Sequence, residues 1–184
     1  MVTYIYHGYP AIPPPGYMKK KIIIVEDEAI ISLGYRMQLQ RLGFDVLGTA
    51  RSFEQAMDLL AKDRPDIILM DIMLKGEMNG IEAADTIRKE TNIPVIFLTA
   101  YADESTLAKA KVTQPYGYII KPFKEIDIHT SIEMALYKHK KEAEVLKERD
   151  LLFNLVEGQG GTKDLLFVKS NSRLVKLKTT DIYF

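Results

Sequence analysis

Buried strands alternate with amphipathic helices along most of the chain. The clearest strand spans residues 66–71, where four apolar residues in a row are framed by acids. An apolar run without alternation is typical of a strand covered on both faces, as in parallel sheets. Similar runs predict four more strands, at residues 22–25, 44–50, 94–98 and 118–120.

Helical patterns occupy the intervals between these strands. The first runs through Leu33 and Met37 and ends at Gly43, because glycine favours the position after a helix end. The second begins at the capping-box sequence of residues 52–55 and ends before Pro65. Three further helices are predicted, at residues 81–90, 103–112 and from 125 onward. Five strands alternating with five helices predict an α/β fold, and the simplest topology is a flavodoxin-like, doubly wound parallel sheet of order 2-1-3-4-5.

Composition narrows the protein class. The 184 residues hold 25 Lys and Arg against 25 Asp and Glu, so no overall basic field indicates nucleic-acid binding. The absence of cysteine excludes disulfides and thiolate chemistry. No apolar run approaches the ~20 residues of a membrane span, and no signal peptide is evident. We therefore expect a cytoplasmic protein without membrane contact.

The first 17 residues form a separate segment. Its prolines at positions 10 and 13–15 prevent a helix, and no strand alternation replaces it. We interpret residues 1–17 as a disordered, dispensable leader, with Met18 as an alternative translation start.

Polar residues stand at the ends of four predicted strands. They are Glu26 and Asp27 after the first strand, Asp71 at the third, Thr99 at the fourth and Lys121 at the fifth. Each residue alone could be an ordinary surface or strand residue. Because the first, third, fourth and fifth strands are neighbours in the predicted order, we expect these groups to meet at the carboxyl edge of the sheet.

Three carboxylates in one pocket would repel each other unless a cation compensates. Oxygen ligands without His or Cys suit Mg²⁺, so the three acids are candidate ligands, with the backbone carbonyl of Met73 as a fourth. The metal, the Lys121 ammonium and the Thr99 hydroxyl could each neutralise one oxygen of a phosphoryl group. This pattern points to phosphoryl transfer to Asp71.

The strand-end motifs resemble the receiver domain of two-component response regulators. They are residues 25–27 (VED), 69–71 (LMD), 97–100 (FLTA) and 118–122 (YIIKP). The resemblance covers roughly residues 20–137, and we predict a receiver domain at residues 18–137. It implies that Asp71 is the phosphoacceptor, with Glu26, Asp27, Asp71 and the Met73 carbonyl holding Mg²⁺ and Lys121 contacting the phosphoryl oxygens.

The same resemblance implies a switch rather than an enzyme, one that catalyses its own phosphorylation from a sensor histidine kinase or a small phosphodonor. Thr99 and Tyr118 would change conformation together, and the bond before Pro122 would be cis. The loop at residues 74–80 departs from the family pattern because it lacks the usual proline and is one residue longer. A hydrolase with an aspartyl-phosphate intermediate is an alternative, but it would need a second acid where Met73 stands.

The last helix continues past the end of a usual receiver domain, and residues 138–160 are predicted as a helical extension and linker. A seam of period ~3.5 links Ile132, Leu136, His139, Ala143, Leu146, Asp150 and Phe153. The seam favours a homodimer on activation, although an amphipathic helix packed on its own domain explains it as well. His129 and His139 are expected on the helix surface rather than as metal ligands.

Residues 161–184 predict a β-rich segment, with strands at 165–169 and 173–178 and the start of another strand at 181–184. They resemble the first strands of a LytTR-type DNA-binding domain, which implies that the chain is truncated and that the full protein regulates transcription by binding DNA. The alternative is a receiver that signals through protein contacts of its extended helix to a sensor or kinase, without DNA.

Overall fold

The computed structural model describes residues 19–100, 108, 110–157, 165–170 and 173–178. The chain divides into two compact units, Met1–Lys140 and Lys141–Phe184. The predicted leader lies outside the described residues, as do residues 103–107 and 109 of the predicted fourth helix. The predicted domain ranges therefore stay predictions.

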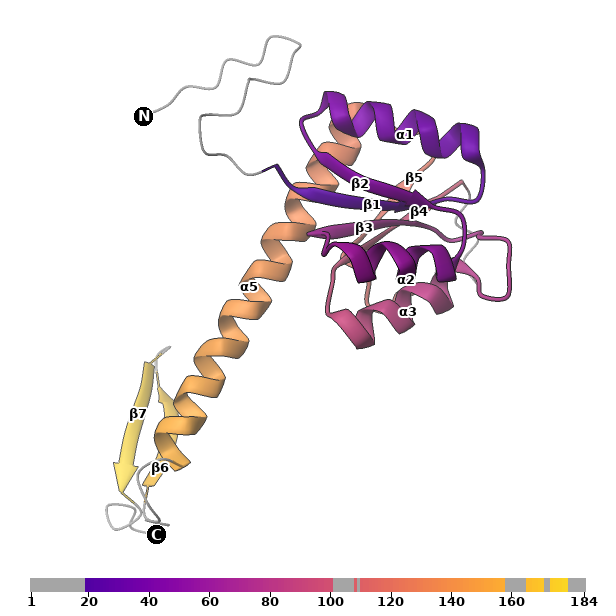
Figure 1. The fold of residues 1–184 in the computed structure, drawn as a ribbon. Helices are drawn as coiled ribbons and strands as arrows, with labels where there is room; N and C mark the ends of the chain where they lie inside the picture. The colour runs from indigo at the N-terminus through magenta and orange to yellow at the C-terminus, as the bar shows by residue number, and fades with distance from the viewer. Residues whose placement is uncertain (1–18, 101–107, 109, 158–164, 171–172, 179–184) are drawn as a thin grey trace, which may run out of the picture. The chain divides into compact units, whose positions relative to one another are not determined.

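The first unit contains one five-stranded parallel sheet. Its strands are β1 (Lys21–Val25), β2 (Asp45–Ala50), β3 (Ile67–Asp71), β4 (Val95–Thr99) and β5 (Gly117–Ile120). The order is β2-β1-β3-β4-β5 and every pairing is parallel (Figure 1). The flavodoxin-like order predicted from the sequence is confirmed.

Helices cover both faces of this sheet. They are α1 (Ala29–Arg41), α2 (Phe53–Lys62), α3 (Gly80–Thr91) and α5 (Glu125–Glu157). Helices α2 and α3 pack on one face, and α1 with the first part of α5 packs on the other (Figure 1).

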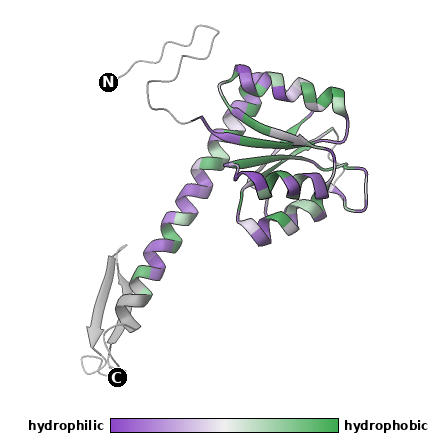
Figure 2. Ribbon diagram, viewed as in Figure 1, coloured by the Kyte–Doolittle hydropathy of each residue, from purple (hydrophilic) through white to green (hydrophobic). Residues whose placement is uncertain are grey.

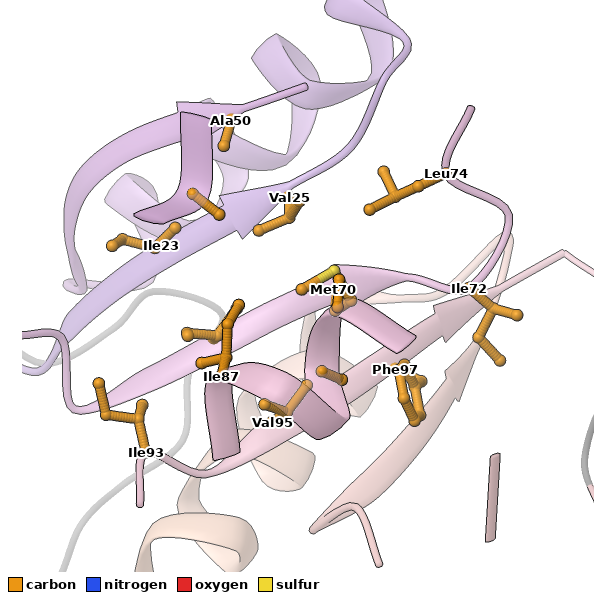
Figure 3. Close-up of a cluster of buried hydrophobic side chains, with 14 of the residues drawn as sticks. Ile23, Val25, Ala50, Met70, Ile72, Leu74, Ile87, Ile93, Val95 and Phe97 are labelled. Carbon is orange, nitrogen blue, oxygen red and sulfur yellow. The ribbon is translucent and has the colours of Figure 1, made fainter. Parts of the chain in front are cut away.

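The two faces explain why the strands are apolar throughout. Alternate residues of one strand enter different cores: Ile23 and Val25 join the cluster under α2 and α3, whereas Ile22 and Ile24 join the cluster under α1 and α5. Figure 3 shows the first cluster, where side chains of β1, β3 and β4 meet Ile87 of α3. The hydropathy colouring shows the same apolar sheet between amphipathic helices (Figure 2).

Helix α1 is confirmed, but its inner face differs from the pattern that predicted it. Leu33 and Met37 are 57% and 60% exposed, and Leu39 is the large apolar residue that is fully buried. Two apolar residues four positions apart, such as Leu33 and Met37, lie on the same face of a helix, but their spacing does not determine whether that face packs against the sheet. Gly43 follows the C-cap with φ of 90°, as predicted for a left-handed position.

Side chains cap the starts of α2 and α3, whereas Glu28 at the start of α1 makes no side-chain cap. Ser52 accepts the N–H of Gln55 at the start of α2, but the Gln55 side chain accepts the N–H of Arg51 rather than that of Ser52. The predicted capping box is therefore only half formed. A complete box, which the sequence analysis missed, starts α3: Asn79 caps the N–H of Glu82, whose carboxylate accepts the N–H of Asn79.

Helix α5 has 33 residues, so the predicted extension is confirmed. Ile132 is fully buried and Leu136 packs against the same core, so the first part of the proposed dimer seam is used within its own domain. His139 is not a plain surface residue, because its Nε2 lies 2.9 Å from the carbonyl oxygen of Asn92 and its ring meets Tyr116 edge-on. Within the described ranges, no helix combines the length and the apolar character needed to cross a membrane.

The second unit contains a hairpin. Strand β6 (Leu165–Ser170) pairs antiparallel with β7 (Arg173–Lys178), with Ser170 opposite Arg173. The short β segment predicted from the sequence is confirmed. The predicted strand start at residues 181–184 lies outside the described residues.

Candidate functional site

Strand ends that are far apart in the sequence bring four of the predicted groups together. Oxygen atoms of Glu26, Asp27 and Asp71 lie within 4.8 Å of one another. The Lys121 ammonium lies 2.7 Å from Glu26 Oε2 and 2.8 Å from Asp71 Oδ2. We call these three acids the acid cluster.

The backbone around Asp71 fixes its carboxylate. Asp71 ends the fully buried strand β3, and its Oδ1 accepts the N–H of Met73 at 3.0 Å. Gly80, the first residue of α3, donates its N–H to the carbonyl of Ile72. A Cβ atom on Gly80 would lie 1.8 Å from the carbonyl oxygen of Asp71, so only glycine allows this close approach. The sequence analysis did not single out Gly80, because the requirement comes from tertiary packing.

Burial disfavours the negative charge of the acid cluster. The pKa of Glu26 is raised, first because burial disfavours the charged carboxylate, and further by the neighbouring charge of Asp71; the hydrogen bond from Lys121 opposes the rise only in part. Burial alone would lower the pKa of Lys121, but the hydrogen bonds to Asp71 and Glu26 outweigh it and raise the pKa. Lys121 therefore stays an ammonium, yet the cluster still favours further positive charge.

The two predicted switch residues lie on neighbouring strands, Thr99 at the end of β4 and Tyr118 within β5, opposite Phe97. Thr99 is buried at the end of β4, and its carbonyl accepts the N–H of Lys121 at 2.7 Å. The Tyr118 ring lies 5.8 Å from that of Phe97, and burial raises its pKa. Its hydroxyl is buried and makes no hydrogen bond within the described part of the chain. The bond between Lys121 and Pro122 is cis, as the family resemblance implied.

Two further residues at the site were not assigned a role from the sequence. The centroid of the Tyr35 ring, on α1, lies 5.7 Å from the Lys121 ammonium and 4.9 Å from the centroid of the tilted Phe123 ring. Lys75, in the loop after β3, places its ammonium 3.1 Å from Asp27 Oδ2. The sequence identified that loop, but it carried no signal for the direction of a single lysine side chain.

Residues 22–133 match the family model described as the response regulator receiver domain. The chain belongs to this family. The match includes all five strands of the parallel sheet except Lys21 and contains every strand-end motif, so the fold is that of a receiver domain. The acid cluster lies within the matched residues.

The receiver domain is similar to several named proteins. Transcriptional regulatory protein PdtaR of Mycobacterium tuberculosis is 27% identical over 158 residues, which cover 83% of this chain and 77% of PdtaR. The uncharacterized transcriptional regulatory protein YrkP of Bacillus subtilis is 36% identical over 134 residues, or 69% of this chain and 56% of YrkP. The signal receiver domain of a modulated diguanylate cyclase from Desulfovibrio desulfuricans G20 matches at 41% identity with a TM-score of 0.64, covering 68% of this chain and 99% of that chain. The chain thus spans little more than half the length of YrkP.

Proposed function

We propose that the receiver domain is a phosphorylation-activated switch in which Asp71 accepts a phosphoryl group from a sensor histidine kinase or from a small donor such as acetyl phosphate. The observation that carries this proposal is the position of Asp71, which lies at the sheet edge beside two other acids and a bonded lysine. An aspartate that only ends a strand would not require two further carboxylates and a lysine beside it. We also place the protein in the cytoplasm, where such kinases and donors are found.

The acid cluster fits a bound Mg²⁺. Its donors are hard carboxylate oxygens from Glu26, Asp27 and Asp71, close enough to share one ion, and the backbone carbonyl of Met73 would complete the protein ligands. The raised pKa of Glu26 supports the same proposal, because burial and the neighbouring charge of Asp71 together outweigh the hydrogen bond from Lys121. Bound Mg²⁺ would supply charge neutralisation to the oxygens of the incoming phosphoryl group.

Each side chain of the site has a separate role in phosphoryl transfer. A carboxylate oxygen of Asp71 bonds to phosphorus while the bond from phosphorus to the leaving histidine nitrogen, or to the acetate oxygen, breaks. The Lys121 ammonium neutralises one phosphoryl oxygen, and the Thr99 hydroxyl turns to donate to another. Tyr118 responds by changing rotamer, and the repacked Thr99–Tyr118 face is the output state.

The direct test is labelling by acetyl phosphate in the presence of Mg²⁺, followed by intact-mass measurement. Wild-type protein should gain one phosphoryl group, and Asp71→Asn should gain none. Asp85→Asn is the matched control, because Asp85 carries an exposed ion pair to Lys89 away from the cluster. Labelling that survives in Asp71→Asn, or that ignores removal of Mg²⁺ by a chelator, would contradict the proposal.

We further propose that the full protein regulates transcription by binding DNA through a LytTR-type domain that begins in the β6–β7 hairpin. Support comes from the antiparallel pairing of β6 and β7, and from relatives that are named transcriptional regulators. The test is footprinting of the full-length protein on its own promoter region, with and without phosphorylation. Absence of a footprint in both states would contradict DNA binding.

A second candidate is a relay through protein contacts, including a homodimer formed on activation. Exposed apolar residues in the middle and second half of α5 favour it: Met134, Tyr137, Val145, Leu146, Leu151 and Phe153. Large exposed apolar side chains along one helix are a common feature of interaction sites. Sedimentation with and without beryllofluoride, a phosphoryl mimic, is the measurement. A monomer in both conditions would argue against the dimer.

A further inference from the structure

Lys75 forms an ion pair with Asp27, the acid of the cluster to which Lys121 is not bonded. Its ammonium lies 3.1 Å from Asp27 Oδ2, whereas Lys121 is bonded to Glu26 and Asp71. The Asp27 side chain is only 13% exposed, and the Lys75 side chain is 79% exposed. Each acid of the cluster therefore faces an ammonium, but the Lys75 contact is the one open to solvent.

We propose that Lys75 is a tethered competitor of the divalent cation: Asp27 binds either the Lys75 ammonium or the metal ion, so Lys75 sets how tightly the site holds Mg²⁺. This inference rests on the proposed metal site. In this inference Lys75 does not bind the metal ion itself, and it affects metal binding only through its contact with Asp27.

Charge and geometry disfavour the binding of both cations to Asp27 at the same time. A magnesium ion binds carboxylate oxygens at ~2.1 Å and retains its own water ligands, so it needs space at the oxygen that Lys75 now contacts. Two cations at one carboxylate also repel each other strongly when water is partly excluded.

The loop allows the exchange without refolding. Leu74, next to Lys75, is buried in the core cluster under α2 and α3, so the loop backbone is anchored there. The Lys75 side chain itself is free to swing into solvent. An exposed ion pair contributes little free energy, so the competition should change affinity by about two- to fivefold rather than by orders of magnitude.

The experiment is a calorimetric Mg²⁺ titration of the full chain. Lys75→Gln should bind Mg²⁺ about two- to fivefold more tightly than wild type, whereas Lys75→Arg, which keeps the charge, should stay near wild type. The matched control is Lys89→Gln, because the Lys89 ammonium also holds an exposed carboxylate, Asp85, at 2.6 Å. That variant should bind like wild type.

The same Lys75→Gln change in an Asp27→Asn protein distinguishes an effect of the Lys75–Asp27 contact from a general effect of removing one positive charge. If Lys75 acts through Asp27, the tightening by Lys75→Gln should disappear when Asp27 is changed to Asn. Equal tightening in both backgrounds would overturn the inference, and so would unchanged or weaker binding by Lys75→Gln. If wild-type protein bound no Mg²⁺ at all, the proposed metal site itself would be wrong.

Discussion

Gly80→Ala tests how closely α3 must approach the end of β3. The added Cβ would lie 1.8 Å from the carbonyl oxygen of Asp71 and 3.0 Å from the Cα of Ile72, whereas ordinary contact begins near 3.4 Å. The neighbours are backbone atoms, so no side chain can rotate away and the strand end must move. Overpacking typically costs about 1–3 kcal/mol, and we expect Gly80→Ala to cost ~3 kcal/mol or more.

The matched control is Gly34→Ala in α1. A Cβ there meets nothing within 4 Å, so removing a helical glycine should stabilise the domain by about 0.5–1 kcal/mol. Urea unfolding followed by circular dichroism measures both variants. Because the displaced backbone belongs to Asp71, Gly80→Ala should also weaken Mg²⁺ binding. A Gly80→Ala protein as stable as wild type would refute the close approach.

Three further predictions concern caps, charge and the extended helix. Asn79→Ala should destabilise the domain by ~1 kcal/mol in urea unfolding because it removes the cap of α3, and an unchanged midpoint would show that the capping box does not contribute. Glu26→Gln should be more stable than wild type in chelator at pH 7. The pKa of Glu26 is raised in the folded state by burial. Ionisation therefore favours the unfolded chain as the pH rises from the ordinary pKa of a glutamate, 4.5, through the higher pKa of the folded state. The advantage should vanish below pH 4.5, and a pH-independent difference would contradict the burial argument. His139→Ala should cost ~1 kcal/mol by loss of the bond to the Asn92 carbonyl and of the Tyr116 edge contact, whereas Met134→Ala, at a position 68% exposed, should be near neutral.

The fold could be predicted because its determinants are local and redundant. Residues 67–70 are apolar on both strand faces, which predicts layers of helices above and below the sheet. Gly43 and Pro65 then limited where the helices could end, and the handedness of crossovers left few topologies.

The acid cluster could be predicted for a related reason. Parallel strands deliver their last residues to one edge, so Asp71 and Lys121 were expected to meet although 50 positions separate them. What the sequence could not supply were contacts that depend on side-chain direction. Examples are Lys75 on Asp27, Tyr35 beside Lys121 and the choice of Leu39 over Leu33 as the inner residue of α1.

Long-range packing accounts for the other differences. His139 was expected on the surface because nothing near it in sequence indicated a partner, and its partner Asn92 lies at the end of α3, 47 positions away. The need for glycine at position 80 also arises only when α3 and β3 are packed together.

The most direct measurement of the central claim is the site of phosphorylation itself. Protein treated with acetyl phosphate and Mg²⁺ is reduced with borohydride, which converts an aspartyl phosphate to homoserine, and the modified residue is located by peptide mass spectrometry. The account predicts modification at Asp71 alone, dependent on Mg²⁺. Modification at Glu26, at Asp27 or at an acid outside the cluster would contradict it.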